Sequence, residues 1–393
     1  MKRRVCVFTG SRADYGLLKP LMNEIQRSPE LDLRILVSGA HLSNDFGMTY
    51  KEIEEDGFII DEKIDIQLIS DTPQGICNSM GHGMTGYSEA LHRLEPDLVV
   101  ILGDRYEAFT MAAAATVCRV PIAHIHGGET TQGAIDEAFR HSITKMSHIH
   151  FTSTEDYGRR VIQLGENPER VIVTGALGIE SILNLNFLSK EELAEELDFD
   201  LGDHFLLVTY HPVTLENNSS KNQFQNLLAA IEQFPDCQII FTKTNTDPDG
   251  KIINSLTDKF VEKSNGRAKA FTSLGQLKYL SAMKYASAVV GNSSSGIIEA
   301  PSLKVPTLNI GDRQKGRTRA NSIIDCCTDK NDIIVNLQKV LSGDFNKLAL
   351  QVENPYEGTA PAKNITNILH TIDLSNTLKK EFYDINVIIT GNR

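Results

Sequence analysis

The chain has 393 residues, 41% of them hydrophobic and 23% charged, which is typical of a globular protein with two or three domains. Its formal net charge of −12 disfavours binding to nucleic acid or to an anionic membrane, and no apolar stretch approaches the ~20 residues of a membrane span. Polar residues follow the N-terminal apolar run too soon for a signal peptide, and the six cysteines show neither zinc spacing nor a disulfide framework. We therefore expect a cytoplasmic protein with reduced thiols.

Short apolar runs alternate with longer amphipathic segments along the whole chain, which is typical of βαβ units and parallel sheets. The sequence predicts a first series of strands at residues 4–9, 33–38, 97–102, 121–125, 148–152 and 170–174. It predicts a second series at residues 205–210, 238–242, 268–272, 287–291 and 305–310. We therefore expect an α/β fold of two Rossmann-like, doubly wound domains, at residues 1–180 and 181–365. Residues 366–393 are expected to form a helix that packs back on the first domain.

Polar clusters follow seven of these strands, and they combine glycine, arginine, histidine and carboxylates. Open α/β sheets bind ligands at the carboxyl ends of their strands. Any single cluster could be an ordinary polar loop, but seven such clusters shared by two domains predict one ligand cleft between two facing sheets.

The clearest cluster is GNSSSGIIEA at residues 291–300, in the second domain. Small residues at a strand-to-helix turn let backbone N–H groups approach an anion, and the helix dipole adds attraction. The hydroxyls of Ser293, Ser294 and Ser295 can donate further hydrogen bonds, and Glu299 could accept one from a ribose diol. The alternative is an ordinary serine helix cap followed by a glycine turn.

A second cluster, GDRQKGR at residues 311–317, places Arg313, Lys315 and Arg317 within five positions, which suits phosphate oxygens. Seen alone, it could be a solvated basic loop. The loop TGSRADYG after the first strand carries Arg12 and Asp14 but lacks the GxGxxG fingerprint, and a Walker A lysine motif is absent. Together the clusters predict a nucleotide diphosphate held mainly by the second domain, with its attached group facing the first.

The first domain carries ionisable residues that suit acid–base chemistry. Asp104 and Arg105 stand at the end of one predicted strand, where Asp104 could act as a base or accept a hydrogen bond. His126 shares one face of the next strand with His124 by alternation. In the helix that follows, Asp136 and Arg140 lie one turn apart, where they can pair. An acid in the first turn of a helix also commonly serves the helix dipole, which is the alternative for Asp136.

The two His-x-His pairs raise the alternative of a zinc or iron site. We expect His124 to be a buried, hydrogen-bonded imidazole, and we expect His148 and His150 to belong to the next buried strand. His126, next to two glycines, is the histidine expected to be functional. The sequence therefore favours an acid–base site without a metal.

Seven motifs in this order carry a family resemblance: SRADYG, GDRYE, HIHGGE, IDEAFRHSITK, YHPVT, GNSSSG and GDRQKGR. Over nearly the whole chain they resemble the hydrolysing UDP-N-acetylglucosamine 2-epimerases, which make N-acetylmannosamine for sialic acid synthesis. The resemblance implies the GT-B fold of two Rossmann-like domains, no cofactor, a UDP-sugar substrate and a homo-oligomer, either a dimer or a tetramer. It implies that UDP leaves by anti elimination to give 2-acetamidoglucal, and that water then adds and inverts C2.

The resemblance also assigns roles to individual residues. It assigns catalysis to Asp104, Asp136 and His211. It assigns nucleotide binding to Arg12, Arg105, Asn245, Ser293, Ser294, Glu299 and Arg313, and the residue patterns add Asp14, Arg140, Ser295 and Arg317 to the substrate site.

One position departs from many relatives, which read HIEGGE with a catalytic glutamate where this chain has His126. His126 could take over that role, Glu129 could take it, or proton transfer could fall to the aspartates.

The family leaves the sugar open, because similar enzymes act on 2,4-diacetamido-trideoxy sugars for legionaminic acid. The remaining alternatives are a non-hydrolysing 2-epimerase, which would retain UDP, and a GT-B glycosyltransferase, which would need an acceptor. A non-enzyme alternative is an inactive nucleotide-sugar sensor, although retention of Asp104, Asp136 and His211 argues against it.

Overall fold

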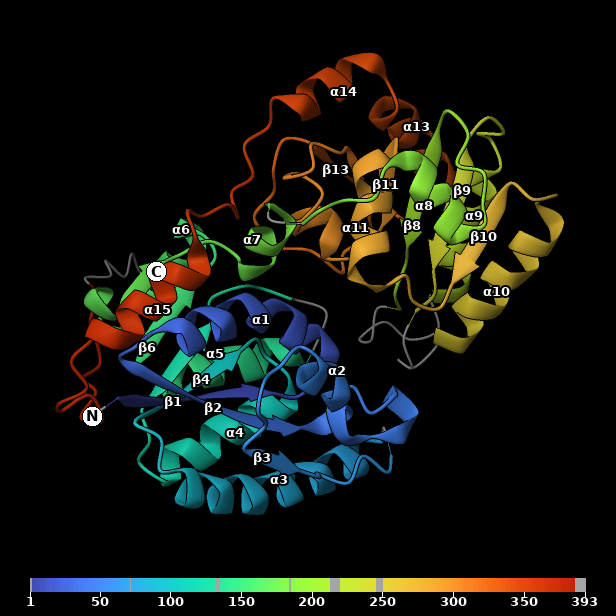
Figure 1. Ribbon diagram of the computed structural model, residues 1–393. Coiled ribbons are helices and arrows are strands. Elements are labelled where there is room, and N and C mark those ends of the chain that lie inside the picture. The colour runs from blue at the N-terminus through green and yellow to red at the C-terminus, as the bar shows by residue number, and fades with distance from the viewer. Residues whose placement is uncertain are drawn as a thin grey trace, which may run out of the picture. The chain divides into compact units, whose positions relative to one another are not determined.

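The computed structural model describes residues 2–70, 72–131, 135–183, 185–212, 220–244 and 250–385. The chain divides into two compact units, each built around its own sheet (Figure 1). The first unit consists of Met1–Glu129, Ile135–Ser181 and Gly358–Arg393. The second unit consists of Thr130–Ala134 and Ile182–Glu357. The chain therefore leaves the first unit, completes the second, and returns to the first from Gly358, earlier than the residue 366 at which the sequence placed the returning segment.

The first unit contains a seven-stranded parallel sheet in the order β3-β2-β1-β4-β5-β6-β7. Its strands are β1 (Arg3–Thr9), β2 (Leu31–Ser38), β3 (Glu62–Ile64), β4 (Leu98–Leu102), β5 (Ile122–Ile125), β6 (Ile149–Thr152) and β7 (Val171–Val173). The order runs outward in both directions from the pair β1–β4, so this sheet is doubly wound as predicted. In this sheet only β3 was not predicted, because two of its three residues, Glu62 and Lys63, are charged.

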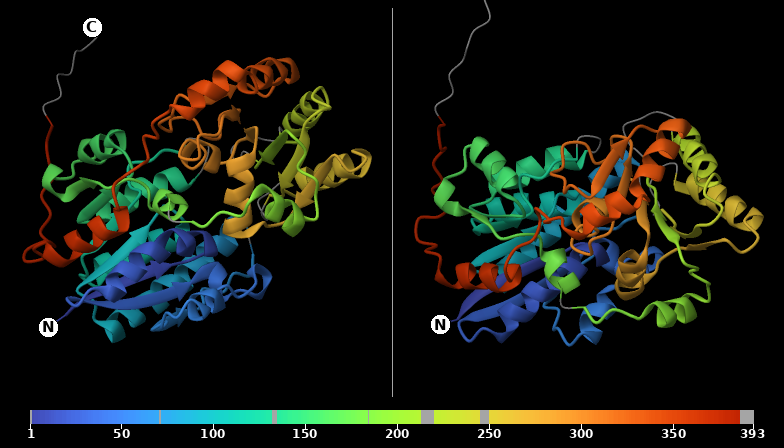
Figure 2. Two further views of the ribbon diagram at one scale, coloured as in Figure 1. Left: turned by 45° about the horizontal axis from the view of Figure 1, so that its top comes forward. Right: turned by 90° about the horizontal axis from the view of Figure 1, so that it is seen from above.

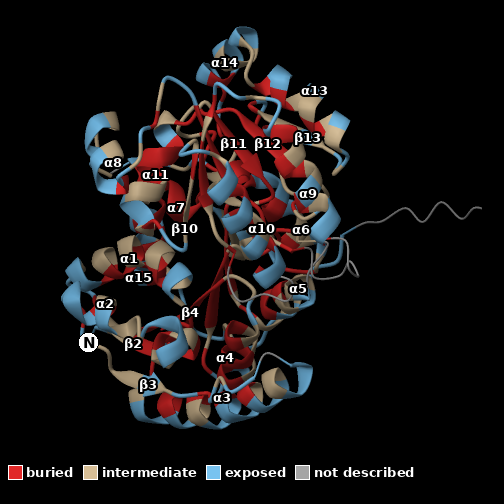
Figure 3. Cartoon of the chain, turned by 90° about the vertical axis from the view of Figure 1, so that its right-hand side faces the viewer, coloured by how far each residue is buried: buried red, intermediate tan, exposed pale blue. Residues whose placement is uncertain are grey.

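Helices cover both faces of this sheet, so its inner strands are buried on both sides (Figure 3). The helices are α1 (Arg12–Arg27), α2 (Tyr50–Glu55), α3 (Pro73–Leu94), α4 (Tyr106–Val117), α5 (Asp136–Met146), α6 (Glu155–Gln163), α7 (Leu177–Leu183) and α15 (Pro361–Thr371). Alternate residues of β1 point into two different cores. Val5 and Val7 join the core that includes side chains of α1 and α15, whereas Cys6 and Phe8 join the core formed with α3 and α4.

The second unit contains a six-stranded parallel sheet in the order β10-β9-β8-β11-β12-β13. Its strands are β8 (Phe205–Thr209), β9 (Gln238–Thr242), β10 (Ala268–Phe271), β11 (Ala288–Gly291), β12 (Thr307–Ile310) and β13 (Ile323–Cys326). Its helices are α8 (Lys190–Leu197), α9 (Ser220–Ile231), α10 (Gly250–Lys263), α11 (Gly275–Tyr285), α12 (Ser295–Ile298), α13 (Lys330–Val340) and α14 (Gly343–Leu350). The order reverses between β8 and β11, so both units are doubly wound.

The returning segment begins with α15, which packs beside α1 (Figure 2). The predicted helix at 366–393 is wrong for residues 372–385, which contain no helix, and residues 386–393 lie outside the described part of the chain. Asp373 accepts hydrogen bonds from the backbone N–H and the hydroxyl of Ser375, a local turn that competes with helix continuation. Farther along, the Lys380 ammonium donates to the carbonyls of Lys145 and Ser147, each at 2.7 Å. This segment thus closes over the C-terminal end of α5.

No helix among the described residues is long and apolar enough to cross a membrane.

Candidate active site

The loops after β1, β4 and β5 meet at the carboxyl edge of the first sheet, because these strands are parallel neighbours. In a doubly wound sheet the strand order reverses between β1 and β4, and ligands bind at such a reversal. The loops there carry Asp104, Arg105, His126 and Glu129, and the first turn of α1 carries Asp14; all five were predicted from the sequence.

Asp104 is held by an arginine from α5. The Arg140 guanidinium forms an ion pair with the Asp104 carboxylate and a second one with Glu137 at 3.2 Å. Only 4% of the Arg140 side chain is exposed, against 21% for Asp104. The sequence predicted that Arg140 would pair with Asp136 within its own helix; the structure gives it Asp104 and Glu137 as partners. Arg140 thereby fixes the direction of a carboxylate that remains partly open to a ligand.

His126 does not continue the strand alternation predicted for it. Strand β5 ends at Ile125, and His126 adopts a left-handed backbone conformation with φ +65°. Its Nδ1 lies 3.7 Å from Oε1 of Glu129, and Ser153 donates a hydrogen bond of 2.9 Å to the same oxygen. The turn after β5 therefore joins the two residues that the sequence left as alternatives.

The two glycines of HIHGGE make this turn possible. A Cβ at Gly127 would lie 3.0 Å from both His124 Nδ1 and Thr144 Oγ1. Gly128 has φ +79°, and a Cβ there would lie 2.4 Å from the carbonyl oxygen of Tyr157. The backbone after His126 is therefore packed too closely for side chains.

His124 and His150 lie in buried strands, as predicted, whereas His148 stands one residue before β6 and is only partly buried. His124 is fully buried between the Gly103 carbonyl, 2.8 Å from Nε2, and the Thr144 hydroxyl, 3.2 Å from Nδ1. Burial lowers the pKa of His124 to about 3. His150 is buried in β6 and lies 2.9 Å from Glu166. Within the described ranges, no group of three or more His, Cys, Asp and Glu residues is arranged to hold a metal ion.

Glu107 is a site residue that the sequence analysis missed. Only 1% of its side chain is exposed, yet it pairs with Arg105 at 3.3 Å, and half of the Arg105 side chain remains exposed. Glu107 also lies against the turn after β1, because a Cβ at Gly10 would be 3.4 Å from Glu107 Cβ. The motif GDRYE contains this residue, but a glutamate in the first turn of a helix is usually read as a solvent-exposed helix-dipole partner.

The charges around this turn affect Asp14. Burial raises the pKa of the Asp14 carboxyl to about 6, with Glu107 adding to the effect and Arg105 opposing it. Glu107 in turn raises the pKa of Arg105. Arg12, by contrast, forms an exposed ion pair with Glu52 of α2 at 3.1 Å.

The carboxyl edge of the second sheet brings together His211, Asn292 and Arg313. The side chain of Asn292 accepts from the His211 N–H and donates to the His211 carbonyl, both at 2.7 Å. The carbonyl of Asn292 accepts from Arg313 and from Gln314, both at 3.0 Å. Burial, with a smaller contribution from Arg313, lowers the pKa of His211 to about 4. His211 is therefore neutral at physiological pH.

The serines of GNSSSG form a hydroxyl cluster. Ser295 lies 2.9 Å from the Ser293 hydroxyl and 2.6 Å from the hydroxyl of Tyr279 in α11. Helix α12 after this loop has only four residues, so the expected contribution of a helix dipole is small. Ser294 accepts the backbone N–H of Ile298 with its carbonyl, which closes that single turn. The hydroxyls, more than the helix, make this loop suitable for an anion.

Glu299 follows α12, and burial raises the pKa of its carboxyl to about 7. Arg317 donates its backbone N–H to the Gln314 carbonyl at 3.3 Å, which folds the GDRQKGR loop back on itself. Asn245, predicted to bind the nucleotide, lies outside the described residues.

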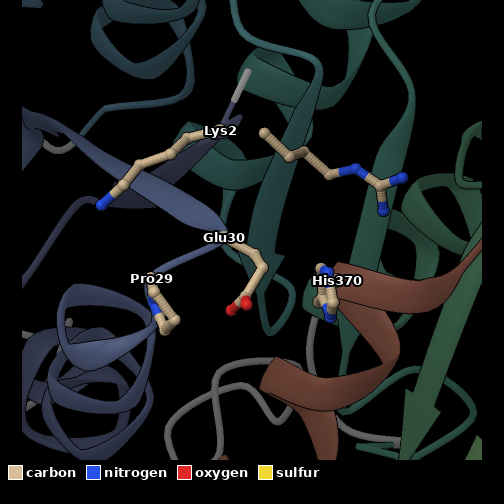
Figure 4. A pocket seen from close by; sticks show the side chains of 5 residues that line it. Lys2, Pro29, Glu30 and His370 are labelled. Atoms are coloured by element: carbon tan, nitrogen blue, oxygen red, sulfur yellow. The ribbon is translucent and has the colours of Figure 1, made fainter.

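Of two surface hollows, one lies away from these residues and one lies beside the GDRQKGR loop. One, of about 410 Å³, is lined by Lys2, Arg3, Pro29, Glu30 and His370 (Figure 4). It lies where β1 and β2 begin, at the opposite edge of the first sheet from the predicted residues. The other, of about 540 Å³, lies beside β13 in the second unit, and its lining includes Gly311, Asp312, Lys315 and Gly316 of the GDRQKGR loop.

Comparisons with known proteins agree with this architecture. The profile of the family described as UDP-N-acetylglucosamine 2-epimerase matches residues 23–370. The chain is 43% identical, over 98% of its length and 100% of the relative's, to GDP/UDP-N,N'-diacetylbacillosamine 2-epimerase (hydrolyzing) of Campylobacter jejuni. It is 39% identical, over 98% of both chains, to polysialic acid biosynthesis protein P7 of Escherichia coli. The S. aureus MnaA–UDP structure has a TM-score of 0.79 at 18% identity and covers 98% of this chain and 100% of that one, which establishes the GT-B-like fold.

Proposed function

The chain belongs to the UDP-N-acetylglucosamine 2-epimerase family, and on that basis we propose that it is a hydrolysing 2-epimerase of a UDP-linked 2-acetamido sugar. The observation that carries this proposal is the match to a hydrolysing 2-epimerase along 98% of the chain. Arg313 after β12 suits stabilisation of the departing UDP, and Asp104 after β4 suits removal of the C2 proton.

The proposed reaction begins with loss of UDP. The C2 hydrogen of the sugar is not acidic, so the bond from C1 to the diphosphate oxygen must break far enough to build positive charge at C1. UDP leaves with the electron pair of that bond, and a base removes the C2 proton, which leaves a C1–C2 double bond. Water then adds its hydroxyl to C1 while a proton reaches C2 from the opposite face. The sum is UDP-sugar plus water giving UDP and the free 2-epimer.

Departure of UDP places charge on the diphosphate, and stabilising that charge is the central electrostatic task. Arg313, which is hydrogen-bonded to the Asn292 carbonyl, and the hydroxyls of Ser293 and Ser295 are suited to this task. His211 stands beside Arg313 as a neutral imidazole, so we assign it a hydrogen bond to the phosphate rather than a charge.

Removal of the C2 proton requires a directed base. Asp104 is the first candidate, because the buried Arg140 fixes its direction while it stays partly exposed. Asp136 begins the same helix as Arg140. His126 and Glu129 form a second candidate acid–base pair on the neighbouring loop, and either of them is the alternative to the aspartates for the role of the glutamate in HIEGGE relatives.

For the sugar, we propose UDP-N,N'-diacetylbacillosamine as the first candidate substrate, because the 43% identical relative is named for it. UDP-N-acetylglucosamine, yielding N-acetylmannosamine for sialic acid, is the second candidate. It is supported by the family description and by the 39% identity to a polysialic acid biosynthesis protein.

The test is a turnover assay followed by proton NMR in D2O, with each UDP-sugar supplied separately and the GDP-linked diacetyl sugar as a third substrate. We expect release of free nucleotide and a free 2-epimer that carries deuterium at C2. The preferred sugar is the one with the higher kcat/KM. Retention of UDP on the epimerised sugar would indicate a non-hydrolysing epimerase, and binding without turnover of any of these sugars would indicate a sensor.

A further inference from the structure

At the carboxyl edge of the second sheet, one asparagine connects three loops. Asn292 is fully buried at the end of β11, where the strand order of the sheet reverses between β8 and β11. Its backbone N–H donates to the Thr209 carbonyl at 3.1 Å, and its side chain closes both hydrogen bonds with the backbone of His211 after β8. Its carbonyl accepts from Arg313 and Gln314 after β12.

The ends of β8 and β11 are packed against each other without room for a side chain at Gly291. Gly291 has φ +134°, and a Cβ there would lie 1.9 Å from the Thr209 carbonyl oxygen. The backbone of β11 therefore passes directly against the end of β8, and this contact brings the Asn292 side chain within reach of His211. An amide is the side chain that can both donate to a carbonyl and accept from an N–H here.

We propose that Asn292 is a positioning residue that sets His211 and Arg313 at a fixed separation for the diphosphate of the nucleotide. Its side chain determines where His211 lies, and its carbonyl determines where the Arg313 guanidinium lies. Because both functions belong to one buried residue, the imidazole and the guanidinium move together. This inference rests on the proposed function, in which the second unit binds the nucleotide.

Asn292→Ala removes the side chain that holds His211 and keeps the backbone carbonyl that accepts from Arg313. If the Asn292 side chain acts through His211, its removal has no further effect on binding once the His211 imidazole is gone. The experiment is a double-mutant cycle with Asn292→Ala and His211→Ala, read as the dissociation constant of UDP by calorimetry, with GDP as a second probe. We expect each single variant to lower the affinity for UDP about tenfold or more, since charge-assisted hydrogen bonds to phosphate are lost or misdirected. We expect the double variant to be within about threefold of His211→Ala alone.

Thermal unfolding of each variant accompanies the cycle. The control is Asn226→Ala, which removes a side-chain bond to the Thr328 carbonyl in the same unit at 3.0 Å and should leave UDP affinity within about twofold. If Asn292→Ala does not fold, Asn292→Asp replaces it, because a carboxylate keeps the acceptor for the His211 N–H and loses only the donor.

The outcomes separate two failures. The positioning role would be overturned if the fold-losses in UDP affinity of the two single variants multiply in the double variant. It would also be overturned if Asn226→Ala lowers UDP affinity as much as Asn292→Ala does. Failure of the unaltered protein to bind either UDP or GDP would instead overturn the nucleotide site itself.

Discussion

The guanidinium of Arg140 and the carboxylate of Asp104 form an ion pair in which the arginine is almost entirely removed from water. Its planar group cannot be replaced by another cation without changing that geometry. The pair is therefore expected to contribute both to the stability of the fold and to the orientation of Asp104 in catalysis.

Replacing Arg140 with leucine should lower the free energy of unfolding by about 3–5 kcal/mol, because Asp104 and Glu137 lose a buried counter-charge. Urea denaturation measures this change. The matched control is Arg12→Leu, which removes an exposed ion pair with Glu52 and should cost only about 0–1 kcal/mol. Equal losses in the two variants would contradict the burial argument.

Proton abstraction can be assigned with four neutral variants: Asp104→Asn, Asp136→Asn, His126→Gln and Glu129→Gln. Each retains side-chain size, and the variant of the true base should lose roughly 10²–10⁴-fold in kcat while UDP binding stays nearly normal. The readout is deuterium incorporation at C2 in D2O, with the glycal supplied separately to isolate hydration. Near-normal rates in both aspartate variants would leave His126 or Glu129 as the base.

Glu107→Gln tests whether the buried carboxylate orients Arg105. We expect KM for the UDP-sugar to rise roughly tenfold, because a neutral amide holds the guanidinium less firmly than a carboxylate does. Glu62→Gln is the control, since it removes an arginine pair at the edge strand β3 and should leave steady-state kinetics unchanged. An unchanged KM in Glu107→Gln would make this glutamate a purely structural residue.

His124 makes stability dependent on pH. Burial lowers its pKa from 6.5 to about 3, so the unfolded chain binds a proton more readily than the folded one. Its contribution is present above pH 6.5 and is lost as pH falls toward about 3. In His124→Gln, unfolding free energy should therefore decline less steeply between pH 6.5 and 4 than in the unaltered protein. Parallel pH profiles would show that His124 titrates normally.

Activity should survive chelation, because the elimination and hydration steps need no metal. Turnover measured after EDTA dialysis should match the untreated enzyme. Loss of turnover that zinc or manganese restores would replace the acid–base assignment with a metal site.

The sequence was sufficient to predict a strand where the local pattern of apolar residues alone determines it. Continuous apolar runs predicted the inner strands of both sheets, because burial on both faces leaves no polar position. Strands β3 and β13 were missed, because both are short and charged residues interrupt their apolar pattern, at Glu62 and Lys63 in β3 and at Asp325 in β13.

The site was harder to predict where contacts link distant segments. The burial of Glu107 depends on the turn after β1, and the role of Asn292 depends on the strand end at His211. His126 was placed by strand alternation, which the left-handed turn interrupts. None of these three features has a signature within its own segment.

The closure of the chain over α5 has a consequence for the order in which the protein can be assembled during translation. Ala362 donates its N–H to Glu180, and Lys380 donates to the carbonyls of Lys145 and Ser147, yet residues 182–357 of the second unit are synthesised between these partners. The second unit can fold as soon as it leaves the ribosome, while the first unit must wait for its last helix. The apolar surface of α1 that α15 covers is therefore exposed on the nascent chain until residues 361–371 have been made.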